Sequence, residues 1–142
     1  MLALDRQTYD AIVAHARRDH PDEACGIVAG RDGRPTRIIP MANAARSPTF
    51  YEFEAREQLR VFTDIEDAGE DLYVIYHSHT ATEAYPSRTD VRIAGYPEAH
   101  YVVVSTRDPQ AVEFRSFRIN DGVVTEEPVR VEDGSVGAAV SA

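Results

Sequence analysis

Two histidines separated by one serine follow directly on an apolar stretch, and they are the residues of this sequence best suited to chemistry. Residues 72–76 are apolar and rich in β-branched and aromatic side chains, which predicts a buried strand. Because side chains two apart in a strand point to the same side, His77 and His79 are expected to project together from its end. Taken alone, such a pair is weak support for a metal site, because histidines at a strand end can simply be polar edge residues.

A serine and an aspartate follow within a dozen residues. Ser87 and Asp90 have the spacing of a helix capping box, and for an isolated pair that structural interpretation is the stronger one. The helix expected over residues 87–94 also brings the Asp90 carboxylate back toward the two histidines. Two imidazoles and one carboxylate suit Zn²⁺ and leave the fourth coordination position for water. The combined pattern therefore predicts one zinc ion per chain, held by His77, His79 and Asp90.

Two further polar residues could complete a hydrolytic site. Glu23 precedes residues 24–30, a run of small residues that predicts a strand able to lie beside the central one. Zinc lowers the pKa of bound water to about 7, and a carboxylate that is not a ligand can accept the proton and pass it to a leaving amine. Ser87 could donate a hydrogen bond to the developing oxyanion. Glu23 and Ser87 are therefore the candidate catalytic residues, although a loop glutamate by itself is most often only solvated.

Composition excludes several classes of protein. The 142 residues fit one domain, and the net charge of −9, from 24 acids and 15 bases, argues against a nucleic-acid binder. The single cysteine, Cys25, is expected to be a small buried residue in a chain of the reducing cytoplasm. No apolar run approaches the roughly 18 residues of a membrane span, and residues 1–5 lack the basic start of a signal peptide.

Periodicity and turn residues predict an α/β fold in a single domain over residues 1–131, with one central mixed sheet flanked by helices. The tail, 132–142, is expected to be disordered. Leu59 is placed on the core face of the second helix, and His15 is expected to be a partly exposed helix residue. Helices are expected over residues 5–19, 54–68 and 87–94, and strands over residues 2–4, 24–30, 36–41, 50–53, 72–76, 100–105, 112–119 and 123–131.

The complete spacing resembles the signature of the JAMM (MPN+) zinc metalloproteases, which runs E…H-[ST]-H-x7-S-x2-D. The residues that carry the resemblance are Glu23, His77, Ser78, His79, Ser87 and Asp90. The resemblance covers nearly the whole chain and implies a cytidine-deaminase-like fold whose mixed sheet is mostly antiparallel. It also implies the same roles as the chemistry above: three zinc ligands, a general base and acid at residue 23, and an oxyanion donor at residue 87.

Residues 15–26, 46–51 and 76–90 are similar to actinobacterial members of this family that act in cysteine biosynthesis. The similarity implies a substrate, a ubiquitin-like sulfur-carrier protein bearing cysteine at its C-terminus, and a reaction, hydrolysis of the Gly–Cys bond. Two alternatives stay open: a zinc isopeptidase acting on other ubiquitin-like tails, and a non-catalytic scaffold of the same fold. Thr80 stands where many deubiquitinating members have proline, which weakens the isopeptidase interpretation.

Four residues are candidates for substrate binding. Phe50 and Tyr51 belong to an alternating aromatic stretch, residues 50–53, that could pair with the carrier tail as an added strand, or could equally be a core strand. Ser78 and Thr80 flank the second histidine and complete the set. The sequence leaves a homo-oligomer open.

Overall fold

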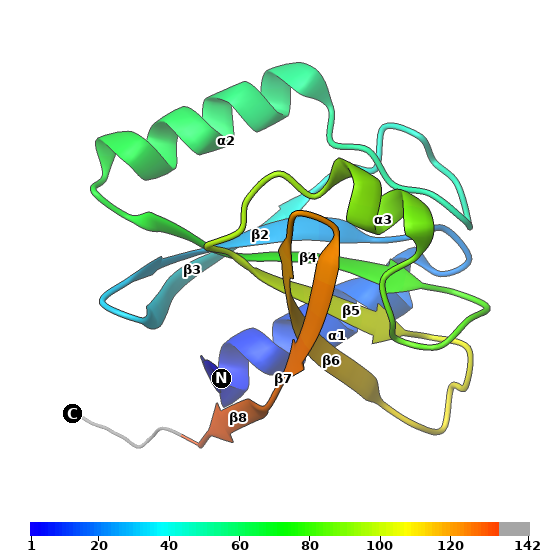
Figure 1. Cartoon of the computed structure of the whole chain (residues 1–142). Helices are drawn as coiled ribbons and strands as arrows, with labels where there is room; N and C mark the ends of the chain where they lie inside the picture. Colours follow the sequence, from blue (N-terminus) through cyan, green and yellow to red (C-terminus); the bar gives the residue numbers. More distant parts are fainter. Residues whose placement is uncertain (134–142) are drawn as a thin grey trace.

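A computed structural model describes residues 1–133 of the chain. Within that range there are three helices and eight strands (Figure 1), in the order β1 (Leu2–Asp5), α1 (Arg6–Asp19), β2 (Cys25–Arg31), β3 (Arg34–Met41), α2 (Ala55–Asp67), β4 (Asp71–His79), α3 (Arg88–Ile93), β5 (His100–Ser105), β6 (Glu113–Asn120), β7 (Val123–Glu127) and β8 (Val129–Glu132). None of the helices in this range is long and apolar enough to cross a membrane. The predicted tail falls mostly on residues 134–142, which lie outside the described residues.

Six strands form the central sheet in the order β3-β2-β4-β5-β6-β7. Every neighbouring pair is antiparallel except β4 and β5, which run parallel. The predicted fold class, an α/β domain with a mixed and mostly antiparallel sheet flanked by helices, is therefore confirmed. β4 lies inside this sheet and carries both histidines at its C-terminal end, where β2 and β5 hold it from either side.

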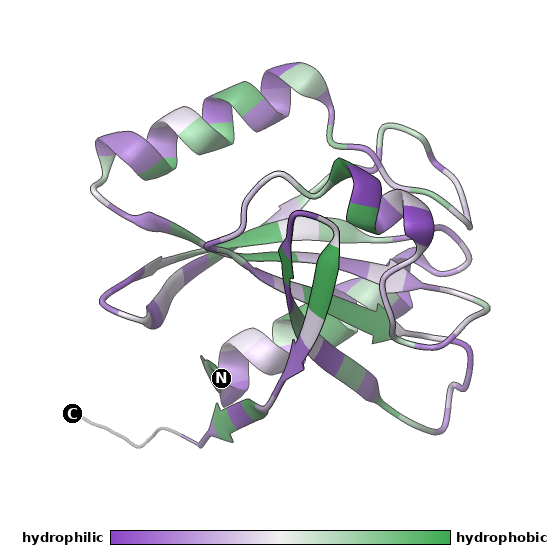
Figure 2. Cartoon of the chain, viewed as in Figure 1, coloured by the Kyte–Doolittle hydropathy of each residue, from purple (hydrophilic) through white to green (hydrophobic). Residues whose placement is uncertain are grey.

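Helices cover both faces of the sheet (Figure 1). On one face, Val61 and Ile65 of α2 join a core cluster with Ile75 of β4. On the other, Ile12 and Ala16 of α1 join a second cluster that contains β4 residues of the opposite orientation. Apolar and polar residues alternate along α2, whereas the inner strands are mostly apolar (Figure 2), as expected of a surface helix packed on a buried sheet.

The N-terminal strand does not join the central sheet, which corrects the expectation of one sheet. β1 pairs in parallel with β8 in a separate two-stranded sheet, and Leu2 and Leu4 are fully buried. Residues 123–131, expected as one strand, are divided at Pro128 into β7 and β8. Proline has no N–H for a ladder, while its carbonyl accepts a hydrogen bond of 2.9 Å from the Leu2 N–H. The chain therefore changes partners at this residue.

The aromatic stretch at residues 50–53 is not a strand, and this prediction was wrong. Its one ladder contact is an isolated bridge between Asn43 and Phe53. The Asn43 side chain instead takes the backbone groups that a strand would pair, because it donates to the Phe50 carbonyl at 2.9 Å and accepts from the Glu52 N–H at 3.1 Å. An asparagine amide thus replaces a neighbouring strand.

Two single-residue expectations also fail. Leu59 is 71% exposed, because the buried stripe of α2 runs through Val61 and Ile65, and a residue two positions away on a helix lies about 200° round the axis. His15 is buried rather than partly exposed. Its Nε2–H donates to Asp19 at 3.0 Å and its Nδ1 accepts from the Tyr76 hydroxyl at 2.6 Å, so the ring serves as a satisfied core group.

Candidate metal centre

The two histidines at the end of β4 point to the same side of the sheet, as the strand period requires. Their Nε2 atoms are 3.1 Å apart, and both side chains are buried. The neighbouring strands fix the position of the histidines along the sheet, because His77 is in register with Cys25 of β2 and with Val103 of β5. Both histidines therefore stand on a strand that is hydrogen-bonded on both sides.

The third group reaches the histidines from the first turn of α3. Ser87 caps this helix by accepting from the Asp90 N–H at 3.0 Å, while Asp90 accepts from the Ser87 N–H at 2.8 Å. The same Asp90 oxygen, Oδ2, lies 3.0 Å from His77 Nε2 and 3.1 Å from His79 Nε2. The capping box and the metal-type cluster are thus one arrangement: the cap orients the carboxylate, and the carboxylate faces the imidazoles.

The donor chemistry of these three atoms fits a cation. His79 Nδ1 must donate to the Glu83 carbonyl at 3.0 Å, so a neutral His79 presents the lone pair of Nε2 to the cluster. That lone pair faces a carboxylate oxygen and a second Nε2, and all three atoms lie close enough together to hold one ion. Tetrahedral Zn²⁺ with bonds of about 2.0–2.2 Å would need ligand separations of about 3.3–3.6 Å. The observed separations of 3.0–3.1 Å are slightly shorter, and a small outward movement of the rings would match them.

The short distances within the cluster also determine the protonation of its three side chains. Burial opposes charge on His79, but the Asp90 hydrogen bond, the Glu83 carbonyl and the Asp90 charge outweigh it and raise the pKa of His79. Burial lowers the pKa of His77, so this ring stays neutral. Burial alone would raise the pKa of Asp90, but hydrogen bonds from His77 and His79 hold it well below its usual range. The cluster therefore attracts one positive charge, which a proton or a metal ion can supply.

Glu23 lies just before β2, at the level of the second histidine. Cys25 pairs with His77, so two further residues along the antiparallel register Glu23 comes opposite His79. Its backbone is fixed on both sides: its N–H donates to the Ser47 carbonyl at 2.9 Å and its carbonyl accepts from Asn43 at 3.0 Å. The side chain is 5% exposed, and burial, only partly offset by His79, raises its pKa to about 7.

The residues predicted to contact substrate fall into two groups. Ser78 is 0% exposed, and its Oγ accepts from the Ala24 N–H at 2.8 Å on the sheet face opposite the cluster. Its side chain therefore points away from the cluster and fastens the segment that carries Glu23 to β4, and a contact with substrate stays a prediction. Thr80 is half-buried and donates to the Pro48 carbonyl at 2.8 Å, so it anchors the loop over residues 43–49 beside the cluster.

Phe50 and Tyr51 lie beside the cluster even though they form no strand. The Tyr51 ring stacks on the His77 ring, with centroids 4.5 Å apart and planes inclined by 24°. Both residues line a groove of about 390 Å³ that continues toward the end of α3, past Ile93 and Ala94. This groove is mostly apolar, and Tyr51 links it to the cluster, because the Tyr51 ring also stacks on His77.

Asn43 is the site residue that the sequence pattern missed. Its amide nitrogen donates to the carbonyls of Glu23 and Phe50, and its amide oxygen accepts from the N–H groups of Ala45 and Glu52. All four bonds are between 2.9 and 3.1 Å long. One side chain thus joins the segment of the candidate base to the segment of the stacking tyrosine. The only feature of the sequence that could have pointed to Asn43 is the presence of an asparagine in a loop that contains no glycine.

Cys25 takes no part in this chemistry. It is fully buried, as predicted, and burial raises the pKa of its thiol to about 12. A thiol with so high a pKa is a poor nucleophile at neutral pH.

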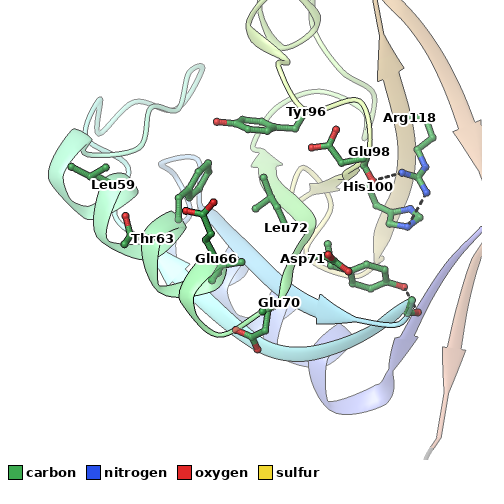
Figure 3. A pocket seen from close by; sticks show the side chains of 15 residues that line it. Leu59, Thr63, Glu66, Glu70, Asp71, Leu72, Tyr96, Glu98, His100 and Arg118 are labelled. Carbon is green, nitrogen blue, oxygen red and sulfur yellow. Dashed lines mark hydrogen bonds between the residues drawn. The ribbon is translucent and has the colours of Figure 1, made fainter.

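Another cavity lies away from the cluster, at the other end of β4 (Figure 3). It measures about 990 Å³ and is bordered by Leu59 of α2, Leu72 of β4 and Tyr96. At its inner wall Arg118 donates to the Glu98 carbonyl and lies 3.1 Å from His100. Glu127 lies 2.6 Å from His100 Nδ1 and 3.5 Å from Arg118 Nε, so the Arg118 charge is compensated within the fold.

Comparison with known proteins gives one family and several relatives. A profile described as prokaryotic homologs of the JAB domain matches residues 5–120. The CysO-cysteine peptidase of Mycobacterium tuberculosis is 64% identical over 133 residues, which are 92% of this chain and 91% of that protein. The desampylase of Haloferax volcanii is 37% identical over 111 residues, 73% of this chain and 80% of that one.

Solved structures agree with the fold. A protein of Desulfitobacterium hafniense superposes with a TM-score of 0.82 at 35% identity and covers 94% of both chains. A JAB1/MPN domain protein of Archaeoglobus fulgidus superposes with a TM-score of 0.62, covering 92% of this chain and 98% of that one. At 17% identity the second likeness concerns the fold alone.

Proposed function

The chain belongs to the family of prokaryotic JAB-domain homologs, and from that premise we propose that it is a zinc-dependent peptidase. Its substrate is a ubiquitin-like sulfur-carrier protein with cysteine attached at the C-terminus. Its reaction is hydrolysis of the Gly–Cys peptide bond, which releases cysteine for biosynthesis. The identity of 64% to a protein named CysO-cysteine peptidase supports this choice, as does a single buried thiol suited to the reducing cytoplasm.

In this proposal His77, His79 and Asp90 hold the metal. Zinc, when bound, supplies electrophilic activation and lowers the pKa of water to about 7. The protein contributes orientation: the capping box fixes Asp90, the Glu83 carbonyl fixes the tautomer of His79, and Tyr51 supports the ring of His77. Such outer partners tune metal affinity by about 10- to 100-fold in other sites.

Glu23 and Ser87 act on the substrate. A carboxyl group whose pKa is about 7 can accept a proton from the attacking water and later donate it to the leaving amine. The Ser87 Oγ accepts from the Asp90 N–H, which leaves its own O–H free to donate to the oxygen of the scissile carbonyl. The products are the carrier with a C-terminal glycine carboxylate and free cysteine.

The observation that carries the proposal is the three-atom cluster with a buried carboxyl group at its edge. The test is mass spectrometry of the mycobacterial carrier CysO, made with one additional C-terminal cysteine, after incubation with the zinc-loaded protein. We expect the loss of one cysteine, abolished by a chelator and restored by zinc. Glu23→Gln should retain zinc and lose turnover by about 10²- to 10⁴-fold. An unchanged carrier with the zinc-loaded wild type would refute the proposed function.

A second candidate follows from the other relatives. The desampylase and a probable TtuB-protein conjugate cleaving protease of Thermus thermophilus, 34% identical over 107 residues, are named for cleaving protein conjugates. An isopeptidase reaction would use the same cluster. A direct comparison distinguishes the two functions. The same carrier is joined either to cysteine or to the side chain of a lysine, and kcat/KM is measured for each conjugate. The conjugate with the larger kcat/KM identifies the preferred reaction.

A further inference from the structure

An arginine lies in the loop that holds the candidate base, between the two residues that fix the Glu23 backbone. Asn43 donates to the Glu23 carbonyl at 3.0 Å, and the Ser47 carbonyl accepts from the Glu23 N–H at 2.9 Å. We propose that Arg46 binds the free carboxylate of the C-terminal residue that the enzyme releases. This inference rests on the proposed function and adds to it the group that makes the enzyme selective for a chain end.

The backbone of Arg46 is held close to Glu23. Its N–H donates to the Asn43 carbonyl at 3.1 Å, which closes a turn over residues 43–46. The next residue, Ser47, is hydrogen-bonded to Glu23. One residue step of about 3.8 Å and one hydrogen-bonded backbone pair of about 5.5 Å therefore separate the Cα atoms of Arg46 and Glu23. An extended arginine side chain is long enough to cross most of that distance.

The loop of Arg46 and the apolar groove approach the cluster from different positions along β4. The Thr80 hydroxyl donates to the Pro48 carbonyl at 2.8 Å, so the loop is fastened to the residue directly after His79, beyond the C-terminal end of the strand (Figure 1). The groove is lined by Ile75, further back in the same strand. A carrier tail in the groove would therefore have its scissile bond at the cluster and its last residue toward the loop of Arg46.

The carboxylate of a single leaving residue must bind close to Glu23. In an amino acid the carboxylate carbon is only about 2.5 Å from the amine nitrogen, and in the proposed reaction Glu23 delivers a proton to that nitrogen. The backbone of residues 23 and 24 is hydrogen-bonded to Asn43, Ser47 and Ser78. Arg46 is the one arginine or lysine in residues 43–47 or in β4, so it is the cation placed to meet this carboxylate.

The Arg46 side chain is free to bind a ligand. It is exposed and makes no hydrogen bond or ion pair with any of residues 1–133. Its φ of 46° lies in the left-handed region that favours glycine. Two other non-glycine residues with positive φ, Asp32 and Asp121, precede glycines in hairpin turns, where such angles are normal. Arg46 has no hairpin to explain its conformation, and strained backbone of this kind is concentrated at functional sites.

The charges around the cluster call for a cation beside the leaving residue. Glu23 and Asp90 place two carboxyl groups at the site, and the whole chain has a net charge of −9. Guanidinium groups are the preferred partners of carboxylates, because the pair can form two parallel hydrogen bonds. Arg46 therefore offsets the repulsion that a terminal carboxylate would meet here. A substrate that continues beyond one residue, or that ends in an amide, lacks this ion pair.

The test compares two substrates that differ by one charge. CysO with an added C-terminal cysteine is prepared as the free acid and as the carboxamide, and kcat/KM is measured with the zinc-loaded enzyme. We expect the acid to be preferred by about 10- to 100-fold, the range of a charge-assisted hydrogen bond, with the difference mainly in KM. Arg46→Met should lower that preference at least fivefold, because it removes the charge and keeps an unbranched side chain. Arg46→Lys retains the charge and should keep more of the preference than Arg46→Met.

The matched control is Arg17→Met. Arg17 is also exposed and without a partner among residues 1–133, but it lies on α1, which packs on the opposite face of the sheet, so this variant should keep the full preference. A distorted loop would slow the hydrolysis of both substrates alike, so the ratio of the two kcat/KM values distinguishes carboxylate binding from a structural defect. Zinc content is measured for every variant.

Two results would overturn the inference and leave the proposed function standing: equal cleavage of acid and carboxamide by the wild type, or a preference that is unchanged in Arg46→Met. Cleavage of neither substrate by the wild type would overturn the proposed function and this inference with it.

Discussion

The Tyr51 ring lies against the His77 ring, with centroids 4.5 Å apart. The contact matters because the two predicted histidine ligands are supported differently. His79 is oriented by a hydrogen bond from Nδ1 to the Glu83 carbonyl, whereas the buried Nδ1 of His77 has no hydrogen-bond partner in the described structure. Ring packing by Tyr51 takes the place of the polar partner that usually orients a metal-binding histidine.

Removal of this ring should weaken metal binding. We expect Tyr51→Ala to lower zinc affinity by about 10-fold, since outer-shell losses commonly cost that much, and Tyr51→Phe to retain it because the stacking surface is unchanged. The measurement is a competition titration against a chelator of known affinity. Equal affinity in Tyr51→Ala and the wild type would show that the strand alone holds His77.

How much of the site could be foreseen depends on the range of the interaction. The shared direction of His77 and His79 follows from the two-residue period of one strand, and the Ser87–Asp90 cap is complete within four residues. Both are local, so sequence spacing captured them. The stacking of Tyr51 on His77 joins residues 26 positions apart and depends on the folded path of the loop, which no local pattern encodes.

The fold likewise has features that local sequence patterns predict and features that depend on distant residues. The α1 stripe through Ile12 and Ala16 and the mixed sheet followed from periodicity. The parallel pairing of β1 with β8 brings together residues more than 120 positions apart, and the aromatic stretch failed as a strand because the Asn43 amide took its backbone partners. Side chains that replace backbone ladders are invisible to a pattern of apolar residues.

Asn43 offers a direct test of the loop that holds the base. We expect Asn43→Ala to lower the free energy of unfolding by about 1–3 kcal/mol, because three partly buried hydrogen bonds and one exposed one lose their partner. We also expect kcat to fall by about 10-fold with little change in zinc content, because the Glu23 segment is released from the loop. Urea unfolding, zinc analysis and turnover of the carrier adduct provide the three measurements.

The chain contains a matched control for this variant. Asn120 ends β6, is exposed, and its side chain makes no hydrogen bond to residues 1–133. Asn120→Ala should therefore leave kcat unchanged. If Asn43→Ala lost stability but kept the wild-type kcat, its role would be structural only.

Glu23 should make the metal-free protein less stable as the pH rises. Its pKa in the folded state is about 7, above the ordinary 4.5, so the folded state holds the proton more tightly between these values. The wild type therefore loses stability as the pH rises from about 4.5 to about 7. Glu23→Gln lacks this penalty, and the stability difference should reach about 1–3 kcal/mol in its favour at pH 8 and vanish near pH 4.

Urea unfolding of both proteins in chelator between pH 4 and 8 gives this comparison. Glu52→Gln is the control, because that glutamate lies nearby in the loop but is exposed, and it should follow the wild-type profile. Parallel profiles for the wild type and Glu23→Gln would mean that the Glu23 carboxylate is ionised at neutral pH in the folded protein.

Zinc binding should release a proton from the cluster. Burial lowers the pKa of His79, but the Asp90 hydrogen bond, the Glu83 carbonyl and the Asp90 charge outweigh it and raise the pKa above its ordinary 6.5. At pH 6.5 more than half of the metal-free protein therefore carries a proton on this ring. The metal needs the neutral ring, and affinity should therefore fall by up to about tenfold per pH unit below the His79 pKa. Calorimetry in buffers of different ionisation enthalpy at pH 6.5 should count at least about half a proton released per zinc ion.

We expect the released proton to come from His79 and not from the exposed His20 nearby. A variant of His20 tests this assignment. His20→Gln removes the exposed imidazole that lies 2.7 Å from Thr106 Oγ1 and leaves the cluster in place, so it should give the same proton count as the wild type. A count near zero in the wild type would mean that zinc does not displace a proton between His79 and Asp90. The three-atom cluster would then be an ordinary hydrogen-bonded group, because a site built to exchange a proton for a metal ion must show that exchange.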